Sequence, residues 1–454
     1  MIFLYILILF SLGVTFVEIL NKFNVFKKNK LNIFELLSFS MLSGLLIFVI
    51  YMFIFGVLGF KYSFNIFIPL IINFIFVIFF LLIRIFRIKI DKKNVFHNFN
   101  FKNSLSLLLF ILFLIWIMYY MFYATTHYII FPDEYAVWLL NPKNIFLGKR
   151  MNFFINTGLE VYPNFLPLLS SGYYFFVDKL EENSIRIFSS IFMLIGTLGL
   201  IGYCKRKDLN ISFVLIMILF MFINYSVIFS LMVSSYGDIA FMTTYTIGML
   251  YLFEWIIYDR KKEFLIISVI NLMCYSFIKT EALYLLCFNI GLLIFVSLFY
   301  RKLKLKTIKL STIAIYSLFI ISLPIIWKIY NILAKFPSRV IVSGSNSLNL
   351  EYSVSLFSNM HSQFYECIPW VILLTIFLIG LFVYGNKLNY KEKLYIVVGI
   401  ATMLINVLFL IICYLTIFGA EALTAASFIR YITRLYMIMI VISLISISSF
   451  FKTK

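Results

Sequence analysis

The stretch SLSLLLFILFLIWIMYYMFY, residues 104–123, decides the fold class of this 454-residue chain. It contains no charged residue, and about twenty predominantly apolar residues are enough for a helix to cross the hydrocarbon core of a bilayer. Similar runs recur along the whole chain, which is 63% hydrophobic and 13% charged. Soluble domains average about 45–50% apolar and about 25% charged residues. The sequence therefore predicts an all-α, polytopic membrane protein.

We predict about thirteen membrane spans from these runs, at roughly 1–20, 34–58, 63–83, 104–123, 183–203, 210–231, 238–257, 264–278, 282–300, 311–330, 367–385, 394–417 and 431–450. Every second connecting segment is rich in Lys and Arg, and these segments with the C-terminal tail hold 26 of the 38 such residues. Cytoplasmic loops carry this excess, so we expect the N-terminus outside and the C-terminus in the cytoplasm. The same placement explains the net charge of +19 without a nucleic-acid partner.

The predicted chain is a single membrane domain without a soluble part. Residues 1–103 are expected to form three accessory N-terminal helices, and residues 104–454 the core. Two long connections, 124–182 and 331–366, lie on the outer side of this topology, and loops of such length are usually functional or partly structured. Between Ala136 and Glu182 two amphipathic pieces are interrupted by proline and polar residues, so we expect helices in the interface plane. They anchor the loop, shape a lipid-facing site, or both.

Ionisable residues gather at the outer ends of the predicted spans, where they are costly and often functional. Asp133 and Glu134 follow the fourth span, and either is a candidate general base; capping of a helix is the alternative. Asp238 closes the short outer turn Ser234–Asp238, where helix capping is again the alternative. Lys279 and Glu281 stand between two apolar runs with scarcely any loop, which favours a functional role over mutual neutralisation.

Two arginines open the last predicted span on the same side. Arg430 and Arg434 oppose the positive-inside tendency, and a phosphate or diphosphate headgroup would require such cations. Snorkelling to the interface is the alternative. A cavity that combines carboxylates and cations on one face suits an enzyme acting on a lipid-linked phosphate. There the cations hold the phosphate and a carboxylate removes a proton from the attacking hydroxyl.

The order of these motifs resembles the membrane glycosyltransferases of the GT-C fold, a superfamily that includes protein O-mannosyltransferases and bacterial aminoarabinose transferases. The resemblance covers roughly residues 130–440 and rests on short motifs in a fixed order: Asp133-Glu134, Trp138, Lys143, Tyr162-Pro163, Tyr236-Gly237-Asp238, Lys279-Thr280-Glu281-Ala282 and Ser427-Phe428-Ile429-Arg430. It implies a GT-C-type helix bundle in a bacterial cell membrane. The Ile-, Phe-, Asn- and Lys-rich composition also suggests an AT-rich bacterial genome.

The resemblance also implies roles for individual residues. Asp133 or Glu134 would be the catalytic base, and Asp238 and Glu281 would orient the acceptor or assist the base. Lys279 and Arg430 would bind the donor phosphate, with Arg434 and Lys143 as weaker candidates. The expected substrate-binding aromatic residues are Trp138, Tyr162 and Tyr236.

The implied donor is a polyprenyl-phosphate sugar, and the acceptor is a hydroxyl of a glycan, lipid or protein. Some members of the superfamily need a divalent metal. Two or three carboxylates of this chain could share one, but no ligand spacing demands it, and no other cofactor is implied. Two further functions remain open: a transporter or flippase of lipids or glycans, and an envelope-glycan polymerase or ligase. The latter class uses diphosphate-linked donors and relies more on arginines than on acidic pairs.

Overall fold

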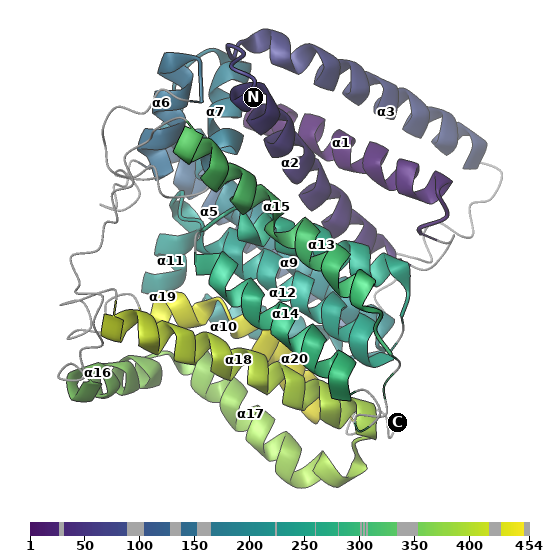
Figure 1. Cartoon of the computed structure of the whole chain (residues 1–454), viewed down its shortest axis with the longest axis vertical. Coiled ribbons are helices and arrows are strands. Elements are labelled where there is room, and N and C mark those ends of the chain that lie inside the picture. The colour runs from purple at the N-terminus through teal and green to yellow at the C-terminus, as the bar shows by residue number, and fades with distance from the viewer. Residues whose placement is uncertain are drawn as a thin grey trace.

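A computed structural model describes residues 1–26, 31–88, 104–127, 138–151, 165–222, 225–258, 260–279, 281–299, 307–333, 353–416 and 428–448, with Lys302 and Leu305. All regular elements in these residues are helices (Figure 1). The predicted all-α class is therefore confirmed.

Ten helices in the described ranges are long and apolar enough to cross a bilayer. They are built on α1 (Ile2–Lys22), α2 (Ile33–Val57), α3 (Ile68–Ile88), α5 (Ser104–Thr126), α9 (Ile187–Arg206), α12 (Asp238–Phe253), α14 (Glu281–Phe299), α15 (Leu310–Leu333), α17 (Ile368–Tyr384) and α18 (Tyr390–Thr416). Four of these spans include an adjoining short element: η1 (Phe64–Phe67) precedes α3, α8 (Glu182–Ile185) precedes α9, the π-helical turn η4 (Glu254–Tyr258) follows α12, and η6 (Gly385–Lys387) follows α17. These helices support the prediction of a multi-pass membrane protein.

Three predicted spans differ in the structure. The segment 210–231 is divided into α10 (Ile211–Met221) and α11 (Tyr225–Val233), and the segment 431–450 overlaps α19 (Phe428–Thr433) and α20 (Tyr436–Ser446). The predicted span 264–278 falls on α13 (Lys262–Ser276), which has 15 residues. Hydropathy averaged over a span does not detect such breaks, because a single polar residue between the helices, such as Arg434, is outweighed by its apolar neighbours. The total of about thirteen spans stays a prediction.

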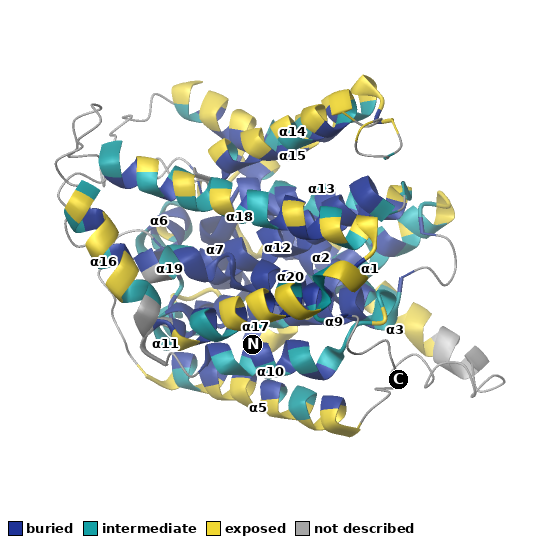
Figure 2. Cartoon of the chain, turned by 90° about the horizontal axis from the view of Figure 1, so that it is seen from below, coloured by how far each residue is buried: buried dark blue, intermediate teal, exposed yellow. Residues whose placement is uncertain are grey.

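Burial separates the helices into a centre and a rim (Figure 2). Every residue of α12 is buried, and α9 and α20 are buried along most of their length. Helices α3, α5, α14, α15 and α17 expose many large apolar side chains, as helices do where they face lipid. Glycines allow the central helices to approach closely. A Cβ at Gly196 would lie 2.8 Å from the Thr243 hydroxyl, and one at Gly199 would lie 2.6 Å from Ile247.

The first two helices pack directly on the rest of the bundle. The Tyr5 hydroxyl donates a hydrogen bond to the carbonyl of Leu169 at 2.8 Å, and Ser38 of α2 donates one to the carbonyl of Ile195 in α9. Helices α1 and α2 cross where a Cβ on Gly13 would lie 1.7 Å from the carbonyl oxygen of Ser40. Backbone-to-backbone packing of this kind is typical of helix pairs in membranes.

The ends of α12 define the two ends of the bundle, which we name the Asp238 end and the Glu254 end. Helices α6 (Leu140–Gly148), α7 (Phe165–Val177), α11, α16 (Ser353–Glu366) and α19 gather at the Asp238 end, on the left of Figure 1. All residues of α7 except Val177 are buried, so this helix differs from the amphipathic helix expected in the long outer loop. Its polar residues are small serines, which fit between helices.

Candidate anion-binding site

Asp238 is placed by a tight turn between α11 and α12. The Ser189 hydroxyl donates a hydrogen bond to the carbonyl of Ser234 at 2.8 Å and ties this turn to α9. Gly237 allows a close approach, since a Cβ there would lie 3.0 Å from Ile278 and 3.3 Å from Trp138. Asp238 is the first residue of α12, after the N-cap residue Gly237, and neither of its carboxylate oxygens accepts a hydrogen bond from a described backbone N–H. The structure therefore does not support the capping alternative for this carboxylate.

Two buried cations share one oxygen of the Asp238 carboxylate. Lys279 Nζ donates to Oδ1 at 2.9 Å, and Arg434 donates to the same oxygen through Nε at 3.0 Å and Nη2 at 2.6 Å. Asp238, Lys279 and Arg434 are only 1%, 4% and 7% exposed. Arg434 therefore points into the protein, which contradicts the snorkelling alternative for this residue.

Arg430 approaches the other oxygen of the same carboxylate. Its Nε lies 3.4 Å from Asp238 Oδ2, and its side chain is 20% exposed. It belongs to α19, a helix of six residues, whereas Arg434 lies in the turn between α19 and α20. We call Asp238, Lys279, Arg430 and Arg434 the Asp238 cluster. Three elements far apart in sequence thus bring four of the predicted site residues together.

Aromatic rings surround the cations of the cluster. Lys279 Nζ lies 5.9 Å from the centroid of the Trp138 ring, and the Arg430 guanidinium lies 4.9 Å from that of Tyr236. The Arg434 guanidinium lies 4.6 Å from Phe241 and 4.3 Å from Tyr431. The negative face of an aromatic ring attracts a cation, and the effect is larger where water is excluded. The rings therefore stabilise positive charge at a site from which water is largely excluded.

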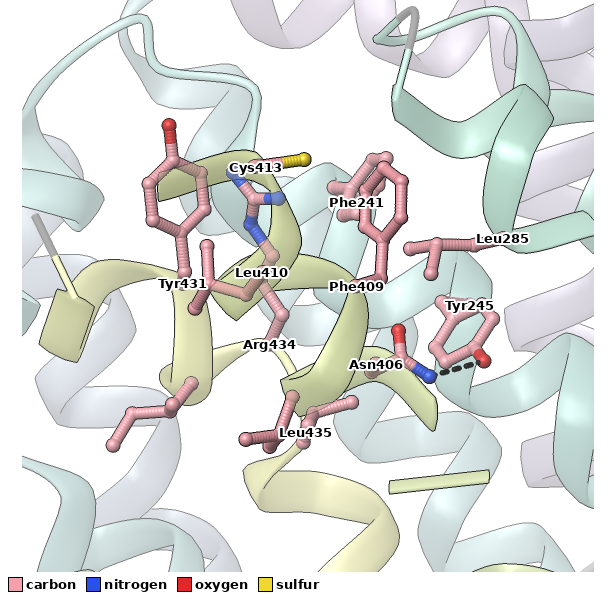
Figure 3. A pocket seen from close by; sticks show the side chains of 12 residues that line it. Phe241, Tyr245, Leu285, Asn406, Phe409, Leu410, Cys413, Tyr431, Arg434 and Leu435 are labelled. Carbon is pink, nitrogen blue, oxygen red and sulfur yellow. Dashed lines mark hydrogen bonds between the residues drawn. The ribbon is translucent and has the colours of Figure 1, made fainter. Parts of the chain in front are cut away.

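A narrow apolar cleft begins beside Arg434 (Figure 3). Its volume is about 40 Å³, and its walls come from α12, α14, α18 and the α19–α20 region. Leu410 and Cys413 line it beside Arg434, and Leu285 lines it further away, next to Tyr245, whose hydroxyl accepts a hydrogen bond from Asn406 at 2.9 Å (Figure 3). An apolar cleft that meets cations at one end matches a ligand with a hydrocarbon tail and an anionic head.

The cleft lies against the lipid-facing rim of the bundle. Tyr284 of α14 is 60% exposed, and its ring stacks on Phe409, a cleft residue of α18, at a centroid distance of 5.8 Å. Leu404, Leu408 and Ile412 of α18 are also exposed. A ligand chain can therefore reach the cleft from the surrounding bilayer if these side chains move.

Of the other predicted charged site residues and Tyr162, the structure describes the side chain of Lys143 alone. Lys143 forms an ion pair with Glu182 at 2.5 Å, in the region of α6 and α8. Glu281 begins α14, but its side chain is not among those described. Asp133, Glu134 and Tyr162 lie outside the described residues. Their predicted roles stay predictions.

The described residues contain no group of three or more His, Cys, Asp or Glu side chains that could hold a metal ion. In the Asp238 cluster the neighbours of the carboxylate are cations, which oppose the binding of a further cation. This site therefore does not fit the divalent metal that some GT-C enzymes use.

Sequence reasoning missed several residues at the Asp238 end of the bundle. Phe241 and Tyr431 contact Arg434, but aromatic residues make up 20% of this chain, so these two do not stand out in the sequence. Arg186 is fully buried and donates to the Asn183 side chain at 3.1 Å. It stands at the outer start of a predicted span, against the positive-inside tendency, and that signal was available in the sequence.

A second ionic cluster lies at the Glu254 end, and we call Glu35, Arg206, Lys207 and Glu254 the inner cluster. Arg206 pairs with Glu35 through two nitrogens, and Lys207 pairs with Glu254 at 2.7 Å. Tyr251 also donates to Glu35 at 2.6 Å. In addition, the Glu35 carboxylate accepts a hydrogen bond from the backbone N–H of Asn32 and so completes a capping box at the start of α2. This cluster joins α2, α9 and α12.

No protein-family model, curated protein or solved structure matches this chain.

Proposed function

We propose that this protein transfers a sugar from a polyprenyl-phosphate donor to a hydroxyl acceptor on the outer face of a bacterial cell membrane. The observation that carries the proposal is the convergence of Lys279, Arg430 and Arg434 on Asp238, together with the apolar cleft that Arg434 also lines. Arginine and lysine side chains are the usual ligands of phosphate, and arginine binds it in a bidentate manner. The cleft is the place for the first part of the donor's hydrocarbon chain.

In this proposal the cations act mainly on the leaving group. The acceptor oxygen attacks the anomeric carbon, the bond between that carbon and the phosphate oxygen breaks, and negative charge accumulates on the phosphate. Cations positioned at the developing charge lower the barrier for this step. A base must take the proton of the acceptor hydroxyl, and we assign this role to Asp133, with Glu134 as the alternative.

Trp138 connects the proposed base with the cluster along the chain. Asp133 precedes Trp138 by five residues, and five residues extend over at most about 18 Å. Trp138 itself lies beside Lys279. Covalent connection therefore keeps the backbone of Asp133 within this range of a residue that contacts the Asp238 cluster.

The test is sugar transfer by purified protein in lipid nanodiscs, with a panel of polyprenyl-phosphate sugars that carry a radioactive label. Asp133→Asn and Lys279→Ala are expected to abolish transfer while the protein stays folded. Lys328→Gln is the matched control, because Lys328 is an exposed cation in the last part of α15. Normal transfer by both site variants would refute the assignment.

A second candidate, an envelope-glycan polymerase or ligase, is favoured by the composition of the cluster. Two arginines and a lysine face one carboxylate, and such enzymes use cations to hold a diphosphate-linked donor. A comparison of monophosphate- and diphosphate-linked donors in the same assay separates the two functions. Turnover of only the diphosphate-linked donor would favour the polymerase or ligase.

A further inference from the structure

Asp238 occupies the position at which a phosphate would meet the cations. Arg434 directs Nε and Nη2 at the carboxylate, and Lys279 reaches the same oxygen. A phosphate oxygen can accept hydrogen bonds from the same donors. Because all three side chains are less than a tenth exposed, water cannot easily replace either anion. A phosphate that binds the N–H groups now directed at Oδ1 therefore competes with the carboxylate for them.

The surroundings of Asp238 do not suit a general base. Its Oδ1 accepts hydrogen bonds from Lys279 and Arg434, and its Oδ2 faces Arg430. A general base must lie within hydrogen-bond reach of the proton that it removes. Both oxygens are directed at cations instead, so the interactions of this carboxylate are with the phosphate-binding groups.

We propose that Asp238 is a built-in competing anion for the phosphate site, and thus a positioning residue. It holds Lys279, Arg430 and Arg434 together when no phosphate is bound, and it recovers Arg434 and Lys279 when a phosphate leaves. The inference rests on the proposed function for its ligand, an isoprenyl phosphate. It concerns binding and release, which can be measured without sugar transfer.

The charges of donor and product explain why a competitor is useful. The donor is a phosphodiester with one negative charge. After the sugar has left, the product is a phosphate monoester with a charge of about −1.5 to −2 at pH 7. Three cations therefore attract the product more strongly than the donor, which favours the chemical step but slows release. A carboxylate that competes for the same cations weakens the hold on the product.

The experiment measures binding of farnesyl phosphate to the full-length protein in nanodiscs, with farnesol as the probe that lacks the phosphate. Asp238→Asn keeps the shape of the side chain and removes its charge. The variant is expected to bind farnesyl phosphate about tenfold more tightly than the wild type, the order expected for the loss of one competing charge. Binding of farnesol is expected not to change. Where transfer is measured, kcat falls and inhibition by farnesyl phosphate increases.

Unchanged or weaker binding of farnesyl phosphate to Asp238→Asn overturns the inference, and so does a wild type that binds it no better than farnesol. A purely structural role predicts equal weakening of both probes. If Asp238→Asn binds more tightly but no sugar is transferred by any form, the inference stands and the proposed function fails. If sugar is transferred but binding does not tighten, the proposed function stands and the inference fails.

A double variant keeps the inference testable if Asp238→Asn does not fold. Asp238→Asn combined with Arg430→Gln removes one charge of each sign. We expect Arg430→Gln alone to weaken binding about tenfold, and the double variant to return to within about threefold of the wild type. A double variant as weak as Arg430→Gln alone would show that the carboxylate does not compete.

Discussion

The two ionic clusters at the ends of α12 use the same side-chain types in different proportions. In the inner cluster two carboxylates face two cations, and Glu35 also receives hydrogen bonds from Tyr251 and the Asn32 backbone. In the Asp238 cluster one carboxylate faces three cations. Sixteen residues, or about 24 Å of helix, separate the two. A balanced cluster can join helices without a ligand, whereas a surplus of cations favours an added anion.

Secondary structure supports this contrast. The inner cluster connects the ends of long helices, α2, α9 and α12, and its carboxylates are almost completely buried. Two arginines of the Asp238 cluster lie on or beside the short helix α19, and Arg430 is partly exposed. A helix of only six residues has few internal hydrogen bonds and is marginally stable on its own. We therefore expect the Asp238 cluster to rearrange more readily than the inner cluster.

The largest expected effect is loss of sugar transfer in Arg434→Gln. This substitution removes a bidentate phosphate ligand and is expected to lower kcat/KM about 10³-fold, the upper range for the loss of one charge-stabilising donor. Transfer assays with equal amounts of folded protein, judged by size-exclusion chromatography, provide the measurement. Activity within threefold of the wild type would show that the Asp238 cluster is not part of the donor-binding site.

For Glu35→Gln in the inner cluster we expect the reverse of Arg434→Gln: a loss of stability with little loss of sugar transfer. Loss of this buried charge leaves Arg206 without its bidentate partner, so we expect stability to fall by about 3 kcal/mol. Transfer per folded molecule is expected to stay within twofold of the wild type. Thermal unfolding in detergent, followed by the same transfer assay, tests both statements. A large loss of specific activity at unchanged stability would mean that the inner cluster takes part in function.

Filling the apolar cleft tests the hydrocarbon part of the proposed donor site. Leu285→Trp places a larger side chain in a cleft of about 40 Å³ and is expected to raise KM for a long-chain donor about tenfold. Leu318→Trp is the matched control, since Leu318 is an exposed residue of the neighbouring helix α15. Equal KM values in both variants would place the donor chain elsewhere.

The smallest effect is expected for Tyr251→Phe, which removes one hydrogen bond to Glu35. Stability should fall by about 1 kcal/mol, because the carboxylate keeps its pair with Arg206 and the Asn32 N–H. Thermal unfolding of Tyr251→Phe and Glu35→Gln under the same conditions compares the two losses of stability. A fall as large as that of Glu35→Gln would show that the hydroxyl, rather than the ion pair, holds the inner cluster together.

Much of the fold could be predicted because bilayer-spanning helices need long apolar runs, and these are visible in the sequence. The run at residues 104–123, for example, lies within α5. The break between α19 and α20 could not be predicted, since a polar residue such as Arg434 can stand inside a continuous span as well as at the end of a helix. Tertiary packing, rather than hydropathy, determines where such helices end.

The candidate site, like the fold, could be predicted from the sequence only in part. Ionisable residues in apolar surroundings are conspicuous, so Asp238, Lys279, Arg430 and Arg434 were all identified from the sequence. Their pairing was not identified, because Lys279 has Glu281 as a close neighbour in sequence and the other partners are far away. The structure pairs Lys279 with Asp238, 41 residues earlier in the chain. Only the packing of α12, α13 and the α19–α20 region brings these side chains together.

The central claim is that the Asp238 cluster binds the phosphate of an isoprenyl lipid. An electron cryo-microscopy structure of the protein in nanodiscs with farnesyl phosphate tests it most directly. The account predicts phosphate density within hydrogen-bond distance of Arg434 and Arg430, with the hydrocarbon chain entering the cleft beside Leu285. Lipid density at another site, with Lys279 and Arg434 still bound to Asp238, would contradict the account.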